Sequence, residues 1–294
     1  MTQPPDIPPG TPPPAPGCYR HPERTTYVRC TRCDNPICPE CMRSASVGFQ
    51  CPDCVGEAAR TVRQPVTVAG GALVTKPYVT WTLIGVTVAV FLWQFAAGVG
   101  QVAEDFGMWP FGIALYGEWW RLLTAAFLHG SWLHIAFNMY VLFLFGPVLE
   151  RVLGHVRFTM LYVVAALGGS VASYVFSDPR TVSVGASGAI FGLMGAVIVA
   201  GKRLRWDITQ VLVLLGINVV IGFLSPEVDW RAHFGGLVVG ALGAAVFVWT
   251  PPPFRSARVL WQVFGVLAIL GVLVVVTMWR TGQLWTMLAP LGVG

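Results

Sequence analysis

Charged residues are scarce in this chain. Only 11% of its 294 residues are Asp, Glu, Lys or Arg, while 55% are hydrophobic. Soluble domains carry about 25% charged residues, so a soluble globule of this length could not cover its surface with so few. The net charge of +5 indicates no nucleic-acid partner, because the basic residues are scattered singly and form no stripe. The composition therefore predicts an all-α polytopic membrane protein surrounded by a lipid bilayer.

The chain also lacks cysteine beyond residue 54 and lacks an apolar segment at its start. Because a charged start followed by a short apolar region is missing, we expect no signal peptide. Residues 1–17 are rich in proline and are expected to form a disordered tail. Residues 18–54 hold all seven cysteines, and residues 55–76 are expected to be a linker.

Seven apolar segments follow this linker. A helix rises about 1.5 Å per residue, so roughly 20 apolar residues cross the hydrocarbon layer. The stretch 100–131 is long and mixed, with several tryptophans, and amphipathic aromatic stretches of this kind lie in the membrane interface. The predicted spans cover residues 79–99, 132–149, 156–176, 187–201, 208–224, 233–250 and 259–279.

Lys and Arg are divided unequally between the two sides of these spans. With the N-terminus inside, 15 of the 19 Lys and Arg residues lie on the inner side and four on the outer side. The opposite orientation would contradict the excess of Lys and Arg that cytoplasmic loops carry. We therefore expect a multi-pass protein of the cell membrane with a cytoplasmic N-terminus and an extracytoplasmic C-terminus.

The cysteines occur in pairs separated by two residues, and a histidine completes the first pair. Such a gap lets two side chains reach one tetrahedral metal ion. Eight ligands are enough for two zinc ions, and four ligands per ion leave no open position, so the sites are expected to be structural. A domain of about 40 residues has too little core to fold without such support. The pairs are Cys18 and His21, Cys30 and Cys33, Cys38 and Cys41, and Cys51 and Cys54.

This segment resembles a B-box-type zinc finger, in which the ligand pairs interleave. The resemblance implies that the first and third pairs bind one ion, and that the second and fourth pairs bind the other. Spacing alone leaves sequential pairing open. A cytoplasmic protein is the partner expected for this module.

Polar groups within apolar spans are costly, so each is a candidate for function. His134 and Asn138 are four residues apart and share one helix face near the start of the second span. Ser187 opens the fourth span between glycines, and His233 opens the sixth. The predicted topology places His134, Ser187 and His233 at one depth, near the outer ends of their spans. Alone, each group is more typical of helix packing or of a hydrogen bond between helices than of catalysis.

Together, these residues suit nucleophilic catalysis. A serine hydroxyl is a weak nucleophile that needs a neighbouring base, which His233 would supply to Ser187. The backbone N–H of Ser187, with His134 and Asn138, would donate hydrogen bonds to an oxyanion. Because no Asp or Glu lies within these spans to orient the histidine, the arrangement predicts a Ser–His dyad. By contrast, Glu150 is expected to be structural and Arg121 to be an interfacial anchor that extends toward water.

Five motifs in this region resemble the rhomboid family of intramembrane serine proteases. Each motif is weak alone, but five in this order at the edges of predicted spans are specific. The resemblance covers residues from about 79 to 250. The motifs are Trp120-Arg121, His134-x3-Asn138, Glu150-x3-Gly154, Gly185-x-Ser187-Gly188 and Ala232-His233-x-Gly235-Gly236.

The resemblance implies a six-helix protease core over residues 77–250, with one added helix in residues 251–294. The active site would open near the extracytoplasmic face, and the substrates would be transmembrane segments of other membrane proteins. No cofactor would take part in catalysis. The fifth span and a cap around residues 225–232 would admit substrate.

The family also implies a role for each polar residue. Ser187 would be the nucleophile and His233 the general base, while His134 and Asn138 match the oxyanion positions. One departure is Phe191, which stands where several relatives have a tyrosine stacked on the catalytic histidine. Phenylalanine keeps the apolar ring face and loses only a hydroxyl.

Two other functions compete with this interpretation. A non-catalytic rhomboid-like protein that binds membrane clients for quality control usually lacks the serine or the histidine, and both are present here. A metal transporter would fit the histidines and the zinc module, but the spans lack the deep acidic ligands that such cations use. We therefore expect an intramembrane serine endopeptidase.

Overall fold

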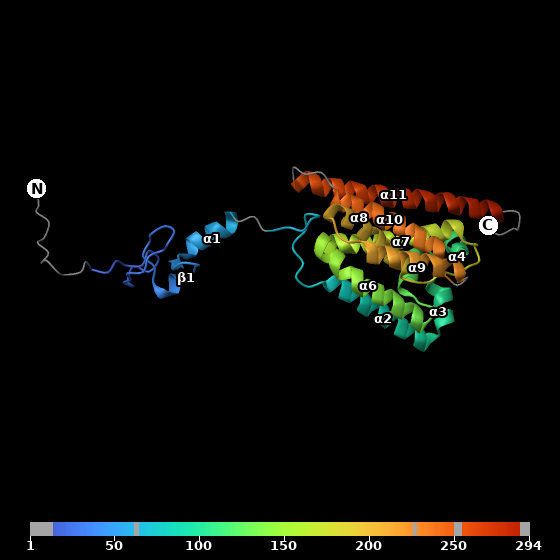
Figure 1. The fold of residues 1–294 in the computed structure, drawn as a ribbon, viewed down its shortest axis with the longest axis horizontal. Helices are drawn as coiled ribbons and strands as arrows, with labels where there is room; N and C mark the ends of the chain where they lie inside the picture. The colour runs from blue at the N-terminus through green and yellow to red at the C-terminus, as the bar shows by residue number, and fades with distance from the viewer. Residues whose placement is uncertain (1–13, 62–64, 226–227, 250–254, 289–294) are drawn as a thin grey trace, which may run out of the picture. The chain divides into compact units, whose positions relative to one another are not determined.

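The computed structural model describes residues 14–61, 65–225, 228–249 and 255–288. The chain divides into two compact units, Met1–Gln64 and Pro65–Gly294. Most of the expected proline-rich tail, residues 1–13, lies outside the described residues. The prediction of a helical polytopic fold preceded by a small cysteine-rich domain is confirmed (Figure 1).

The N-terminal unit is built around its cysteines. Two short strands, β1 (Arg43–Ser44) and β2 (Phe49–Gln50), pair antiparallel, and helix α1 (Pro52–Thr61) follows them. A 3-10 helix, η1 (Pro39–Cys41), precedes the strands. The buried core consists of Ile37 and all the cysteines except Cys33. So small an apolar core cannot hold a domain together without further crosslinks.

Each of the seven predicted spans is a helix in the second unit. Six are long and apolar enough to cross a membrane, whereas the fifth is a shorter apolar helix. The helices are α2 (Tyr78–Ala97), α6 (Trp132–Leu153), α7 (His155–Phe176), α8 (Ser187–Leu204), α9 (Thr209–Leu224), α10 (Trp230–Val248) and α11 (Arg255–Leu288).

Helices α8 and α10 approach each other through glycine. A Cβ atom added to Gly236 would lie 1.9 Å from the carbonyl oxygen of Gly188, which no real side chain could tolerate. One turn further, a Cβ atom on Gly240 would lie 2.3 Å from the Cα atom of Gly192. The small-residue pattern that the sequence carries at these positions therefore corresponds to a real helix contact.

The mixed segment between α2 and α6 folds into short helices held by a buried arginine. These are α3 (Val99–Phe106), α4 (Pro110–Tyr116), α5 (Arg121–Thr124) and the 3-10 helix η2 (Ala125–Phe127). Arg121 donates hydrogen bonds to the Glu118 carboxylate at 2.6 Å and to the carbonyl oxygens of Glu104 at 2.7 Å and Gly107 at 3.0 Å. The expectation of an arginine extended toward water is wrong, because Arg121 is only 4% exposed and crosslinks this segment.

Glu150 is structural, as the sequence indicated. Its buried carboxylate accepts hydrogen bonds from the backbone N–H groups of Val79 at 2.9 Å and Thr80 at 2.8 Å, and from the Thr80 hydroxyl at 2.6 Å. It also lies 2.5 Å from Nδ1 of His155. Because the first N–H groups of a helix have no partner within it, this carboxylate caps α2 and joins it to α6 and α7.

The segment expected as a linker is more structured than predicted. Helix α1 occupies its first part, and a turn around Thr67 occupies its second part. The backbone oxygen of Ala69 accepts a hydrogen bond from Gln262 of α11 at 3.0 Å, and Ala69 itself is buried. Residues 65–77 therefore belong to the membrane unit, because their backbone packs against it.

Helix α11, the last of the seven, extends beyond the predicted span at both ends. Its C-terminal part is tied to two elements of the core. The hydroxyls of Thr281 and Tyr174 lie 2.7 Å apart, and the Trp285 indole donates to the carbonyl oxygen of Ala114 at 2.6 Å. Since Tyr174 belongs to α7 and Ala114 to α4, α11 connects the core to the interfacial segment (Figure 1).

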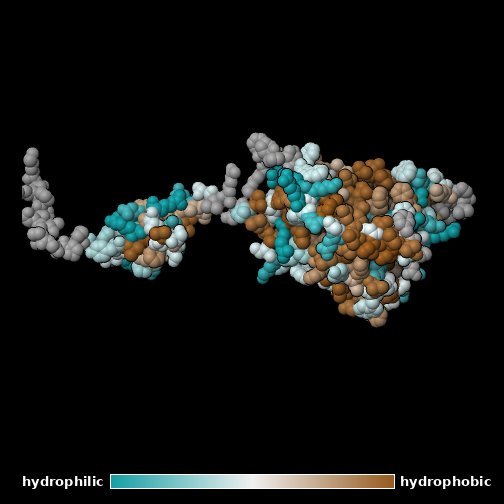
Figure 2. All heavy atoms as spheres, viewed as in Figure 1, coloured by the Kyte–Doolittle hydropathy of each residue, from teal (hydrophilic) through white to brown (hydrophobic). Residues whose placement is uncertain are grey.

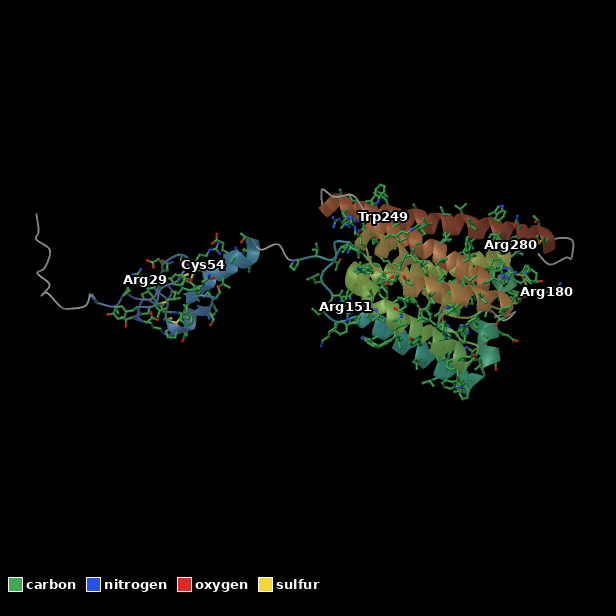
Figure 3. The ribbon with its side chains drawn as sticks, viewed as in Figure 1. Arg29, Cys54, Arg151, Arg180, Trp249 and Arg280 are labelled. Atoms are coloured by element: carbon green, nitrogen blue, oxygen red, sulfur yellow. The ribbon has the colours of Figure 1, made fainter. Side chains whose placement is uncertain are left out.

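Hydrophobic and hydrophilic residues occupy different parts of the surface of the membrane unit, as is typical of a protein that spans a bilayer. Figure 2 shows hydrophobic residues around its middle and hydrophilic residues toward its ends. In Figure 3, Arg151 lies at one end of the bundle, while Arg180 and Arg280 lie at the other. These positions agree with the division of the arginines between two sides that the sequence predicts. Which of the two sides is cytoplasmic stays a prediction from the Lys and Arg count.

Candidate active site

Ser187 is the first residue of α8 and follows a turn that only glycine adopts readily. Gly185 has φ +141°, and its N–H donates to the carbonyl oxygen of Ala125 at 2.9 Å. Ser187 therefore presents its hydroxyl at a helix N-terminus, where backbone N–H groups lack partners within the helix. Those N–H groups are available to a developing negative charge.

His134 and Ser187 border the same point. A Cβ atom on Gly185 would lie 2.9 Å from Nε2 of His134 and 3.4 Å from Oγ of Ser187. Glycine at this position thus leaves room for the imidazole beside the hydroxyl. Ser131 caps α6 by accepting the His134 N–H at 3.2 Å, and the buried ring of His129 packs edge-on against His134 with centroids 4.9 Å apart.

Asn138 lies one turn after His134 on α6 and is buried. Its side-chain amide donates one hydrogen bond to the backbone oxygen of His134 at 2.8 Å. An asparagine amide carries two N–H donors, so one is still available to another acceptor. The predicted i, i+4 relationship of the two residues on one helix face is present in the structure.

His233 lies in the first turn of α10, stacked on Phe191 of α8. The two rings have centroids 4.0 Å apart and planes 13° apart. A Cβ atom on Gly188, which follows Ser187, would lie 3.3 Å from the carbonyl oxygen of Ala232, which precedes His233. The close glycine contact between α8 and α10 thus brings the two segments that carry Ser187 and His233 together.

The described residues include no hydrogen bond between the Ser187 hydroxyl and the His233 ring. Catalytic hydrogen bonds are often long before substrate binds and shorten only in the complex. The geometry therefore places the two side chains on adjacent, closely packed helix starts, and their pairing belongs to the function proposed below.

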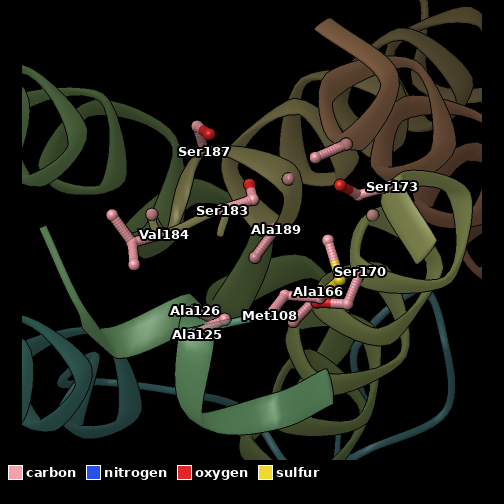
Figure 4. A pocket seen from close by; sticks show the side chains of 14 residues that line it. Met108, Ala125, Ala126, Ala166, Ser170, Ser173, Ser183, Val184, Ser187 and Ala189 are labelled. Carbon is pink, nitrogen blue, oxygen red and sulfur yellow. The ribbon is translucent and has the colours of Figure 1, made fainter. Parts of the chain in front are cut away.

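A small polar cavity lies beside Ser187. Its volume is about 20 Å³, roughly enough for one water molecule. Four serines line it, together with glycines and small apolar residues, as Figure 4 shows: Ser170, Ser173, Ser183 and Ser187. Ser170 and Ser173 come from α7, which the sequence motifs did not single out.

Asp229 is a further residue that the sequence motifs did not indicate. The search for an acid covered only the predicted spans, and Asp229 immediately precedes α10. Its carboxylate accepts hydrogen bonds from the backbone N–H groups of Arg231 and Ala232, both at 3.2 Å. Aspartate is among the strongest N-cap residues, so its place just before a helix start was the available signal.

In the N-terminal unit, the potential metal ligands form two clusters. Within each cluster the ligand atoms lie within 4.8 Å of one another. The clusters follow the interleaved arrangement that the B-box resemblance implies. One contains Cys18, His21, Cys38 and Cys41, and the other contains Cys30, Cys33, Cys51 and Cys54.

The thiol chemistry of these clusters suits a divalent cation. Burial opposes ionisation of Cys18, but hydrogen bonds from the backbone of Cys38, Arg20 and His21 outweigh it and lower the pKa of Cys18 to about 6. Burial, together with the neighbouring thiols of Cys18 and Cys38, raises the pKa of Cys41 to about 11. A cation would relieve this crowding of negative charge, and a Cys₃His or Cys₄ set is typical of structural zinc.

The membrane unit is similar to known rhomboid proteins. Residues 116–250 match the family described as Rhomboid domain. "Rhomboid protease GluP" of Bacillus subtilis is 37% identical over 178 residues, which are 58% of this chain and 35% of that protein. "Putative rhomboid protease YdcA" of the same organism is 38% identical over 131 residues, covering 43% of this chain and 66% of YdcA.

A third relative is matched over more of its own length. "Rhomboid protease AarA" of Providencia stuartii is 27% identical over 213 residues, which are 61% of this chain and 75% of AarA. The chain spans only about a third of GluP and just under two thirds of YdcA. Residues 116–250 therefore match a rhomboid domain, and the membrane unit is similar in sequence to proteins named as rhomboid proteases.

Proposed function

We propose that this chain is an intramembrane serine endopeptidase that cleaves transmembrane segments of other membrane proteins. The observation that carries this proposal is the site around Gly185. There the Ser187 hydroxyl and the His134 ring border one point, while His233 occupies the start of the closely packed helix α10. Relatives named as rhomboid proteases support the same activity at the level of the family.

In the proposed reaction, the Ser187 hydroxyl attacks the carbonyl carbon of the scissile peptide and His233 takes its proton. The carbonyl oxygen becomes an oxyanion that accepts hydrogen bonds from His134, Asn138 and the Ser187 N–H. His233 then gives its proton to the leaving amine, which departs and leaves an acyl-serine. Water, deprotonated by His233, hydrolyses this ester and regenerates Ser187.

The proposed substrate route follows the family. Substrate would enter beside α9 and the cap around residues 225–232, of which 226 and 227 lie outside the described residues. Helix α9 exposes several large apolar side chains, including Leu212, Val213 and Val220. An apolar face of this kind suits contact with a transmembrane helix or with lipid. The orientation that the Lys and Arg count predicts would put the reaction near the extracytoplasmic side.

The test is cleavage of a panel of single-span membrane proteins by the purified, detergent-solubilised chain. Wild-type protein is expected to cleave at least one substrate and to react with a serine-directed fluorophosphonate at Ser187. The variants Ser187→Ala and His233→Ala are expected to lose cleavage while they keep the same thermal melting. Full proteolysis by Ser187→Ala would overturn the proposal. Client binding without cleavage by the folded wild-type protein would favour the non-catalytic alternative.

The metal-transporter alternative gains no support from the structure. Among the described residues, the clusters of three or more potential metal ligands both lie within residues 18–54. No comparable group in the described part of the spans offers a cation a path.

A further inference from the structure

Asp229 is the one carboxylate that caps the helix carrying the proposed general base. One oxygen, Oδ1, accepts the backbone N–H groups of Arg231 and Ala232. The other, Oδ2, accepts a short hydrogen bond from the hydroxyl of Ser173 on α7. The backbone oxygen of Asp229 accepts the N–H of His233 at 3.2 Å, which places the imidazole one helical turn from the carboxylate.

The bond to Ser173 continues into the core. Ser173 is almost fully buried, and its oxygen lies 3.1 Å from the hydroxyl of Ser177. A serine hydroxyl has one hydrogen, so Ser173 donates to Asp229 and accepts from Ser177. Ser173 also lines the cavity beside Ser187. A chain of hydrogen bonds therefore joins the start of α10 to the wall of the proposed active site.

Near its start, the backbone of α10 comes very close to the neighbouring helices. It meets α8 and α7 through glycines: Cβ atoms on Gly235 and Gly236 would lie 2.3 Å from Ala172 and 1.9 Å from Gly188. Farther along α10, the Val239 side chain lies against Gly168 of α7, where an added Cβ atom would be 2.5 Å from the Val239 Cβ atom. So close an approach leaves little tolerance in the position of α10, and the hydrogen bonds of Asp229 add polar restraints to its first turn.

The partners of this carboxylate are neutral donors. The guanidinium of Arg231 lies over the Trp230 ring, 5.1 Å from its centroid, and the described residues include no ion pair to Asp229. The bonds could therefore be kept by a neutral side chain of the same shape. Asparagine caps helices as well as aspartate does, and its amide can donate to Ser173.

We propose that Asp229 is a positioning residue: through its bonds to Ser173 and to the first turn of α10, it holds His233 in register with Ser187. This inference rests on the proposed protease function. It requires no charge on residue 229, only a side chain that caps α10 and bonds to Ser173. A misplacement of about 1 Å at a reacting group can cost about 100-fold in rate, so small shifts of α10 matter.

The experiment compares variants of the full-length protein by steady-state cleavage and by fluorophosphonate labelling. Asp229→Ala removes both the cap of α10 and the hydrogen bond to Ser173. We expect kcat to fall about 10- to 100-fold with KM little changed. Asp229→Asn keeps the shape and is expected to restore most of kcat. Ser173→Ala leaves the cap of α10 in place but removes the hydrogen bond to Asp229, together with the one to Ser177, and is expected to give an intermediate loss. It also keeps the test decisive if Asp229→Ala does not fold.

Asp207→Ala is the matched control. Asp207 likewise accepts a backbone N–H, that of Thr209 at 2.9 Å, but it precedes α9 at the other end of the bundle. We expect its kcat to equal that of the wild type.

Three outcomes would overturn the inference. Unchanged kcat in Asp229→Ala or in folded Ser173→Ala would show that the hydrogen bonds of Asp229 do not position His233. Equal losses in Asp229→Asn and Asp229→Ala would assign the effect to charge instead of position. A folded wild-type protein that neither cleaves nor labels would reject the protease function, and the inference with it, whereas the first two results leave that function intact.

Discussion

Phe191 lies almost parallel to His233, with ring centroids 4.0 Å apart and 13° between the planes. This contact joins α8, which begins at Ser187, to α10. An aromatic face restricts the tilt of an imidazole without offering it a hydrogen bond. Phe191 therefore supplies this restraint with its ring face alone.

Replacing Phe191 tests this contact. Phe191→Tyr is expected to leave kcat within about twofold of wild type, because the ring face is retained. Phe191→Ala removes a buried ring, and such substitutions cost about 3–5 kcal/mol of stability. We expect a clear loss of kcat and a lower melting temperature, measured by cleavage and by thermal melting. A fully active Phe191→Ala protein would show that stacking does not position His233.

Asn138→Ala tests the proposed oxyanion donor. Loss of one such donor costs about 10²–10³ in rate, so kcat should fall far more than KM changes. Asn218→Ala is a close control, because Asn218 also donates to the carbonyl four residues earlier, that of Leu214, at 2.7 Å. If both variants lose the same small amount of activity, Asn138 only supports its helix and does not donate to the oxyanion. His134→Ala is expected to behave as Asn138→Ala does.

The number of zinc ions bound by cysteine variants tests which ligand pairs share one ion. Metal analysis of the purified chain should give two zinc ions per molecule. With interleaved pairing, the double variant Cys18→Ser/Cys38→Ser damages a single site and should retain one zinc ion. The variant Cys18→Ser/Cys30→Ser damages both sites and should retain none. Sequential pairing requires the opposite result for the two variants.

Removal of the metal should unfold the N-terminal unit, because its core consists mainly of the ligands themselves.

The affinity of this unit for zinc should depend on pH. A cysteine thiol in an unfolded chain has a pKa of about 8.5 and is mostly protonated near neutral pH, so zinc must displace protons from its ligands. Affinity is therefore expected to fall as pH falls, and zinc loading should release protons into a weakly buffered solution.

Deleting residues 1–60 should leave cleavage of a simple membrane substrate largely intact in detergent. The cysteine-rich module belongs to a separate compact unit, and the predicted orientation puts it on the side of the membrane opposite the proposed active site. A longer deletion through residue 76 should lower the melting temperature, since it removes the buried Ala69 and its bond to Gln262. If the shorter variant is folded but nearly inactive, the module is coupled to the active site.

Glu150→Ala should destabilise the membrane unit without changing the chemistry. It leaves the N–H groups of Val79 and Thr80 without their acceptor, and an unsatisfied buried polar group costs about 1–3 kcal/mol. Thermal melting is the measurement, and Glu104→Ala, which removes an exposed carboxylate, is the control. An unchanged melting temperature for Glu150→Ala would contradict its role as the cap of α2.

The local features of this protein could be predicted from its amino-acid sequence alone. Apolar runs located seven helices, because the spacing of apolar residues along one helix needs no information from the rest of the chain. The pairs of cysteines two residues apart located the metal-ligand clusters for the same reason. Ser187, His233, His134 and Asn138 were predicted as site residues because each lies in a short motif at the edge of a span.

Contacts between groups far apart in the sequence became visible only in the folded structure. Asp229 bonds to Ser173, 56 residues earlier, and Glu150 bonds to Thr80, 70 residues earlier. Arg121 is buried only because α3 and α5 fold around it, so its own neighbourhood in the sequence suggested an exposed anchor. No periodicity specifies such contacts: they arise when glycine faces let helices approach and each buried polar group must find a partner.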